Sequence, residues 1–211
     1  MLPQNGVDEF DFLRQLALDL GAADAKIISS EKIVIEDRIV LKCKIGCTNY
    51  GKTLMCPPYT PTAEEFRKIA REYGYALFMK FKSKAEADAE VAKYLSKAET
   101  DPTLSAEIRE KVNAFWAAWK EDKRQMLSVI VELEKAAMNK GYPLAIGFVS
   151  GSCYLCEKCN LDKRICSHPT MARYSEDAVG VNVRKTAQNA GISVKFPFEK
   201  NPESFALLLI D

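Results

Sequence analysis

The sequence predicts an α+β fold, in which helices flank a mixed β-sheet and two cysteine-rich loops bind metal. Three observations support this prediction. Apolar residues recur at helical spacing in several segments, short segments rich in Ile and Val separate them, and all seven cysteines fall within residues 43–56 and 153–166. We interpret residues 1–211 as a single metal-binding domain with a helical insertion over about residues 84–140, because no long linker rich in Pro, Ser or Gly divides the chain.

Helices and strands alternate in the N-terminal part of the chain. The apolar spacing over residues 12–20 predicts a helix that ends at the following glycine, and segments 25–29 and 32–41 predict a strand pair leading into the first cysteine. Thr62 then begins a capping-box pattern that predicts a helix ending at a glycine. The apolar run over residues 75–81 predicts a buried strand.

The middle of the chain is predicted to be helical. Residues 91–98 have helical spacing. Residues 101–140 also have helical spacing, but one apolar position is missing near Asp122, so the region is either one long helix or two helices in succession. Trp116 and Trp119 lie on or near the apolar stripe of this region, and we interpret both as core residues.

The C-terminal part predicts further strands and one helix. Residues 144–149 predict a core strand leading into the second cysteine segment, so both cysteine loops are expected to leave the ends of strands. Residues 175–189 predict a helix that Gly191 ends, and segments 192–196 and 205–210 predict two strands.

Composition limits the classes of function. Lys and Arg number 30 against 29 Asp and Glu, and the net charge of +1 gives no field that would attract nucleic acid. The N-terminus shows no signal-peptide pattern, and no stretch approaches the roughly 18 apolar residues of a membrane span. We therefore expect a cytoplasmic protein without nucleic-acid or membrane partners. In that reducing compartment, clustered cysteines indicate metal binding or redox catalysis.

The second cysteine segment has the spacing C-x2-C-x2-C-x6-C, formed by Cys153, Cys156, Cys159 and Cys166. Three thiolates at three-residue steps can reach three corners of a cubane cluster, as in ferredoxins. The segment departs from the ferredoxin pattern because six residues, rather than three, precede its fourth cysteine. Four thiolates also suit zinc, but structural zinc sites more often use two separated C-x2-C pairs, so we favour an iron–sulfur cluster.

Other polar residues accompany this segment. His168 is the only histidine, and we favour a hydrogen bond near a ligand, or exposure to solvent, over direct ligation. Nearby basic side chains would offset the charge of a cluster or dock a redox partner, and an ordinary solvated surface explains them equally well. These basic residues are Lys44, Lys158, Lys163 and Arg164.

The first cysteine segment has the spacing C-x3-C-x8-C, formed by Cys43, Cys47 and Cys56, and it ends in a Cys-Pro step like that of a ferredoxin loop. Three thiolates can hold a 4Fe–4S cluster with one open iron, which is a Lewis-acid site suited to catalysis. The seven cysteines therefore allow one or two clusters. Spacing leaves open whether Cys56 and Cys166 exchange between two sites, and whether the first segment is instead structural or redox-active.

The combined signature is similar to that of a known family. It comprises Cys43-x3-Cys47-x2-Tyr50-Gly51-x4-Cys56-Pro57-Pro58 and Gly151-Ser152-Cys153-x2-Cys156-x2-Cys159-x6-Cys166-x-His168-Pro169. Over nearly its whole length the chain resembles a family of predicted metal-binding proteins, a domain of unknown function found mainly in anaerobic bacteria and archaea. The resemblance implies metal binding at all seven cysteines, and it implies no activity or substrate.

Three functions follow from these residues. The first is an iron–sulfur protein that serves as a redox or electron-transfer accessory to an unidentified redox partner protein. The second is an enzyme with an open-site cluster for sulfur transfer, dehydration or cofactor activation, and the third is a zinc-stabilised binding module. We find no G-x-G-x-x-G, P-loop, G-x-S-x-G or H-E-x-x-H motif, so nucleotide-driven and hydrolytic chemistry have no support in the sequence.

Overall fold

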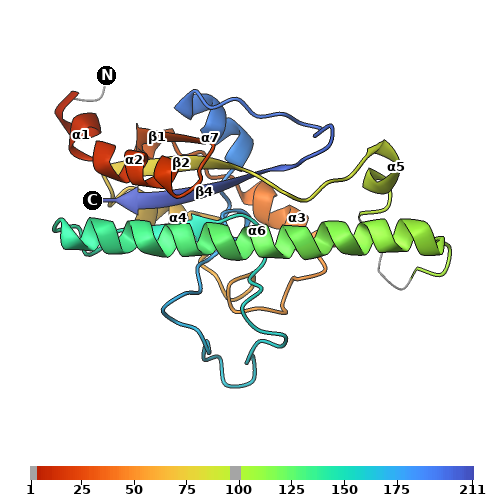
Figure 1. Cartoon of the computed structure of the whole chain (residues 1–211). Coiled ribbons are helices and arrows are strands. Elements are labelled where there is room, and N and C mark those ends of the chain that lie inside the picture. The colour runs from red at the N-terminus through yellow and green to blue at the C-terminus, as the bar shows by residue number, and fades with distance from the viewer. Residues whose placement is uncertain (1–3, 96–100) are drawn as a thin grey trace.

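A four-stranded β-sheet forms the centre of the computed structural model, which describes residues 4–95 and 101–211 (Figure 1). The strand order is β1-β2-β4-β3, and each neighbouring pair is antiparallel. The α+β class is therefore confirmed, whereas the expectation of a mixed sheet is wrong. An apolar run shows that both faces of a strand are covered, but it carries no information on strand direction. The strands are β1 (Asp24–Ser29), β2 (Tyr75–Lys82), β3 (Ile146–Val149) and β4 (Glu203–Ile210).

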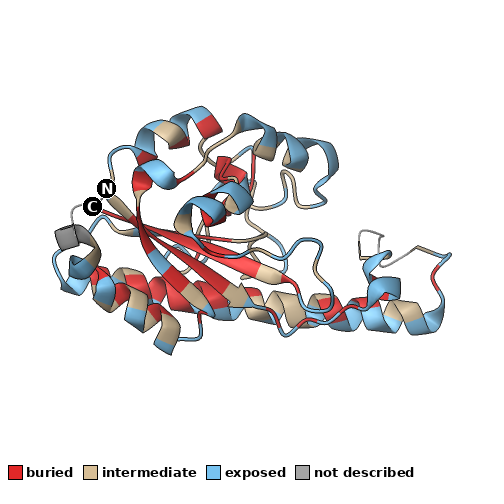
Figure 2. Ribbon diagram, turned by 90° about the horizontal axis from the view of Figure 1, so that it is seen from above, coloured by how far each residue is buried: buried red, intermediate tan, exposed pale blue. Residues whose placement is uncertain are grey.

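Helices cover both faces of the sheet, and Figure 2 shows the buried strands between them. One face packs on α1 (Gln4–Glu9), α2 (Asp11–Asp19) and the second half of α6 (Ala106–Asn139), and the other packs on α4 (Ala63–Ala70) and α7 (Val183–Ala190). Successive residues of β4 alternate between the two cores, with Leu208 in one and Leu207 in the other. Each core therefore depends on the same central strands.

The predicted capping box is present at the start of α4. The Thr62 hydroxyl accepts a hydrogen bond from the backbone N–H of Glu65, and the Glu65 carboxylate accepts one from the backbone N–H of Thr62. The structure also confirms the helix over residues 12–20 and the strands at 25–29, 75–81, 144–149 and 205–210, with small differences at their ends.

The region expected to be a helical insertion contains α5 (Ala89–Ala92) and the single long helix α6. The first half of α6 packs against α5 in a third apolar cluster, in which Trp116 and Trp119 are half-buried. The helix predicted over residues 91–98 is shorter than expected, and part of that range lies outside the described residues. Among the described helices, none combines the length and the hydropathy needed to cross a bilayer.

Residues 32–41 do not form the predicted strand. Ser30–Lys32 is a short helix, η1, Ile35 forms one isolated bridge with Val181, and helix α3 (Asp37–Gly46) follows directly. The helix dipole of α3 is complemented by Asp37 in the first turn and Lys44 in the last turn. In the sequence, the Ile and Val residues of this segment indicated a strand more strongly than these charges indicated a helix. The first cysteine segment consequently begins on a helix and not at a strand end.

Two predictions near the C-terminus are also corrected. Residues 192–196 form no strand and belong to the connection between α7 and β4, where the backbone N–H of Lys195 donates to the Glu203 carboxylate at 3.0 Å instead of to another strand. The helix expected over residues 175–189 is divided into η2 (Asp177–Val179) and α7, because Gly180 between them has a φ of 86° and turns the chain.

Candidate metal centre

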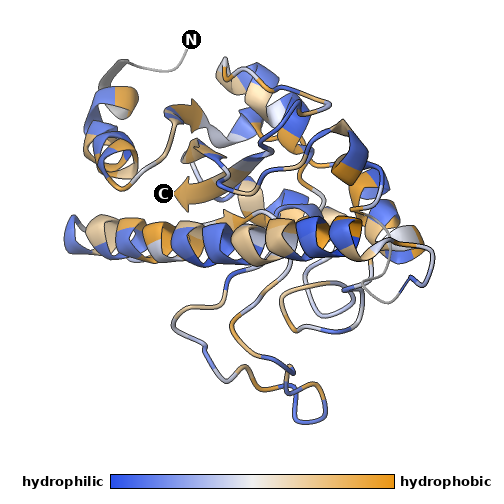
Figure 3. Cartoon of the chain, turned by 45° about the vertical axis from the view of Figure 1, so that its right-hand side comes forward, coloured by the Kyte–Doolittle hydropathy of each residue, from blue (hydrophilic) through white to orange (hydrophobic). Residues whose placement is uncertain are grey.

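Both cysteine segments lie on the same side of the molecule. In Figures 1 and 3 they project below α6, on the opposite side from α1 and α2. The first segment continues from α3, and the second leaves the end of β3 as predicted. None of the seven cysteines belongs to the three apolar core clusters of the described residues. Cys56 is buried, whereas the other six cysteines are half-buried or exposed, so the core supports the cysteine segments largely from outside the apolar clusters.

Cys43 and Cys47 lie four residues apart at the end of α3. Cys43 lies in the last turn of α3 and Cys47 caps its C-terminus, where the backbone N–H of Cys47 donates a hydrogen bond to the carbonyl of Cys43 at 3.3 Å. Burial raises the pKa of the Cys43 thiol to about 11, and the charges of Asp177, Cys47 and Cys56 act in the same direction. A metal cation that binds here must displace this proton.

The four cysteines of the second segment line a single cavity of about 430 Å³. Burial raises the pKa of the Cys153 thiol, and the neighbouring thiols of Cys156, Cys159 and Cys166 add to this effect. The electrostatic neighbours thus divide the seven cysteines into a group of three from the first segment and a group of four from the second.

The two segments are in contact with each other. The backbone N–H of Leu54 donates a hydrogen bond to the Sγ of Cys159 at 3.4 Å, and the Sγ of Cys56 lies 3.7 Å from the Oγ of Ser152. Residues 52–55 of the first segment also line the four-cysteine cavity. Part of the environment of the second group is therefore supplied by the first segment.

Donor groups around this cavity fit a thiolate-bound metal centre. In addition to the Leu54 N–H, the backbone N–H of His168 donates to the Sγ of Cys166 at 3.4 Å. The buried hydroxyl of Thr53, which lines the same cavity, has no hydrogen-bond partner among the described residues. N–H and O–H groups directed at cluster sulfurs stabilise the thiolates and adjust the reduction potential.

The thiols do not converge on one point. Within the described ranges, no group of three or more His, Cys, Asp and Glu side chains is arranged to hold a single metal ion. The His168 side chain is exposed, which is one of the two positions expected for it from the sequence. The four basic residues singled out in the sequence, Lys44, Lys158, Lys163 and Arg164, are all exposed as well.

Sequence reasoning missed a buried polar network beside the second segment. The side chain of Lys123 on α6 is almost fully buried, donates to the Oγ of Ser204 at 2.7 Å, and lies 4.0 Å from the centre of the Trp119 ring. Burial lowers the pKa of Lys123 to about 7. Lys123 is the residue that interrupts the apolar spacing of α6. A charged residue at a position that should be apolar was the sequence signal that could have revealed this network.

Glu176 is the acidic member of this network. It is 1% exposed, and one carboxylate oxygen accepts a hydrogen bond from the Oγ of Ser150 at 3.1 Å. Its Oε1 atom has no partner among the described residues. Burial raises the pKa of Glu176 to about 8, and the charge of Asp177 raises it further.

Comparison with known proteins gives one family match. The model of a family described as predicted metal-binding protein (DUF2284) matches residues 26–210, a range that contains both cysteine segments. The corresponding searches of curated proteins and of solved structures gave no significant match.

Proposed function

The chain belongs to the family of predicted metal-binding proteins (DUF2284), and from this premise we propose that its metal is an iron–sulfur cluster used for electron transfer in the cytoplasm. The second cysteine segment would hold a 4Fe–4S cluster through Cys153, Cys156, Cys159 and Cys166. A bound cluster supplies one-electron chemistry at a potential set by its surroundings.

One observation carries this proposal: four thiols surround a single cavity of about 430 Å³ instead of converging on one position. A zinc ion needs all four ligands at roughly 2.0–2.3 Å from its centre. A cubane is a larger body, and its thiolates approach from separate corners. The two N–H···S hydrogen bonds, from Leu54 and His168, further support thiolates that carry the charge of a cluster.

The protein would contribute positioning and electrostatics. The half-buried residues Tyr154 and Leu155 line the cavity and limit the access of water. The lysines that line it, Lys52 and Lys158, would offset the negative charge of the thiolates and favour the reduced state. Exposed basic residues close to the cysteines would favour an acidic redox partner protein.

Metal analysis of anaerobically purified protein tests the proposal. We expect iron and acid-labile sulfide in about equal amounts, and visible absorption that bleaches on reduction. The Cys156→Ser variant should lose the iron of the second segment, because it removes one of four ligands. The matched control His168→Ala should retain it, because that side chain is exposed. Colourless protein with stoichiometric zinc would refute the proposal and favour the zinc-stabilised module.

A second candidate is an enzyme with an open-site cluster, supported by the separate group of Cys43, Cys47 and Cys56. Three thiolates would leave one iron able to bind a substrate atom. Added cyanide should then change the magnetic resonance spectrum of one reduced cluster and leave the other unchanged. A single cluster, or two clusters that are insensitive to cyanide, would leave electron transfer as the better account.

A further inference from the structure

A second large cavity, of about 770 Å³, shares no lining residue with the four-cysteine cavity. Its walls come from the start of α3, the middle of α6, the N-terminus of α7 and residues 194–205. Lys42 lines this cavity, and the next residue of α3 is Cys43. The cavity therefore adjoins the three-cysteine group, on elements that are fixed to the sheet.

Aromatic side chains line much of this cavity. Trp119, Phe196, Phe198 and Phe205 all contribute to its wall. Phe205 is buried and Trp119 and Phe198 are half-buried, but the Phe196 side chain is 77% exposed. Trp119 already has Lys123 over its ring and Phe115 stacked on it, and Phe205 is stacked on Phe78. The exposed ring of Phe196 is therefore the face best suited to a planar apolar body, which would cover it on binding.

The polar part of the lining is predominantly basic. Three exposed cations, Lys42, Arg184 and Lys195, form no ion pair among the described residues. Two acids, Asp177 and Glu203, also line the cavity. The carboxylate of Glu203 is already engaged, since it lies 3.4 Å from the Nζ of Lys80 and accepts a hydrogen bond from the backbone N–H of Lys195 at 3.0 Å.

Arg38 is the fourth cation of the lining, and it differs from the other three because its guanidinium pairs with Glu36 at 2.9 Å. The first turn of α7 adds the positive end of a helix dipole beside Arg184. The balance of charge in the cavity therefore favours an anion, and the three unpaired cations are the groups free to bind it.

We propose that this cavity binds a small aromatic carboxylate, with its ring against Phe196 near the edge of Trp119 and its carboxylate at Arg184 and Lys195. The guanidinium of Arg184 can bind a carboxylate with two hydrogen bonds, and Lys195 adds a point charge. An electron carrier needs no site for a small molecule, so this inference goes beyond the proposed function. A ligand here would lie next to the helix that carries Cys43 and Cys47.

Fluorescence can localise binding, because the chain has two tryptophans and only Trp119 lines the cavity. In the full-length, metal-loaded Trp116→Phe variant, 4-nitrobenzoate should quench the emission of Trp119 in a saturable manner. The neutral 4-nitrobenzamide should bind about tenfold more weakly, because it lacks the charge that the cations recognise. Calorimetry on the unsubstituted chain checks that the Trp116→Phe change has not altered the site.

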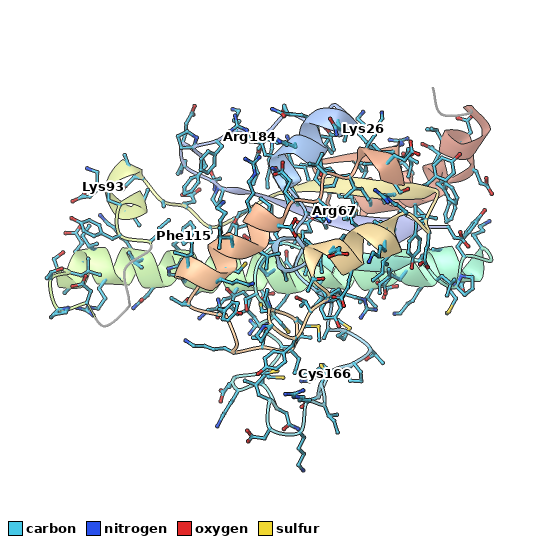
Figure 4. All side chains as sticks on the ribbon, turned by 180° about the vertical axis from the view of Figure 1, so that it is seen from behind. Lys26, Arg67, Lys93, Phe115, Cys166 and Arg184 are labelled. Atoms are coloured by element: carbon cyan, nitrogen blue, oxygen red, sulfur yellow. The ribbon has the colours of Figure 1, made fainter. Side chains whose placement is uncertain are left out.

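Charge variants test the assignment of the cations. Combining Arg184→Gln with Lys195→Gln should weaken 4-nitrobenzoate binding about tenfold and leave 4-nitrobenzamide binding unchanged. The control Lys93→Gln removes an exposed cation that lies beside α5 and outside this cavity (Figure 4), and it should have no effect. Equal binding of the acid and the amide, or no saturable binding of the acid by either method, would overturn the proposal.

Discussion

Single residues in this fold carry unusual charge environments. Lys123 and Glu176 are both buried beside the second cysteine segment, yet their charged atoms form no ion pair within 4.0 Å. Burial therefore disfavours the charged form of each residue, which lowers the pKa of Lys123 and raises that of Glu176. Near neutral pH Glu176 therefore favours its protonated, neutral form, and Lys123 gives up its proton more readily than an exposed lysine.

The stability of the protein should consequently depend on Glu176 in a defined pH range. The pKa of this group is about 8 in the folded chain and near 4.5 when unfolded, so its contribution is complete below pH 4.5 and is lost as pH rises to 8. The groups that face it are Asp177, Lys123 and Ser150. The Glu176→Gln variant lacks this titration.

We therefore expect Glu176→Gln to gain stability relative to the unsubstituted protein as pH rises from 5 to 8, by up to about 1.4 kcal/mol per pH unit. Urea unfolding at several pH values measures this difference. Lys123 has the opposite linkage, because its lowered pKa makes the protein more stable as pH rises above 7, but it is present in both proteins and largely cancels. A difference that does not change with pH would show that Glu176 is ionised in the folded chain.

At the scale of elements, the packing of α6 on β3 depends on one glycine. A Cβ atom at Gly147 would lie 2.1 Å from the Cγ2 of Ile130, so a larger residue fits only if the Ile130 side chain is displaced. We expect Gly147→Ala to lower the free energy of unfolding by about 2–3 kcal/mol. Gly74→Ala is the matched control, because a Cβ there has no neighbour within 4 Å. If Gly147→Ala costs as much stability in an Ile130→Ala background, which lacks the Cγ2 atom, the two residues are not in conflict.

An ion pair joins α6 to the end of the second cysteine segment. Arg173 contacts both carboxylate oxygens of Glu134, and the two side chains are 16% and 13% exposed. The same carboxylate accepts a hydrogen bond from the N–H of Gly147 at 2.7 Å. Glu134 therefore fixes the segment and the strand from which it leaves.

Removing the charge of Glu134 should loosen the metal centre as well as the fold. We expect Glu134→Gln to lose about 1–3 kcal/mol of stability and to release metal faster during dialysis against a chelator, since Arg173 is left without its partner. Glu132→Gln is the control, because its pair with Lys135 is exposed and contributes little. Unchanged metal release with lowered stability would limit the role of Glu134 to the core.

The elements predicted correctly are those in which local spacing and capping agree with the tertiary contacts. The capping box at Thr62 fixed the start of α4, and the apolar run at residues 75–81 marked β2. Residues 32–41 were misread because Ile and Val are frequent in strands, while the polar ends of α3 are weaker signals. The two groups of cysteines follow the two sequence windows, whereas Thr53 and Leu54 could be found only once the segments were seen in contact.

At the scale of the whole molecule, the cysteines lie outside all three apolar clusters of the described residues. Removing the metal should therefore leave the sheet and its helices folded. We expect unchanged helical content by circular dichroism after chelation, together with faster tryptic cleavage at Lys158 and Lys163, which are exposed in the second segment. A cooperative loss of helical signal on chelation would show instead that the metal maintains the core, as it does in zinc fingers.

The position of β4 in the sheet has a consequence for biosynthesis. This strand lies between β2 and β3, although it follows both of them in the sequence and is synthesised after them. On the ribosome, β3 and the cysteine segment that leaves it precede β4, the strand that pairs with β3. The thiols are thus exposed on a nascent chain before the sheet that supports them has formed. Productive cofactor insertion should therefore follow translation of β4. Capture of metal by the unfolded cysteines before that point is the step that the cell must prevent.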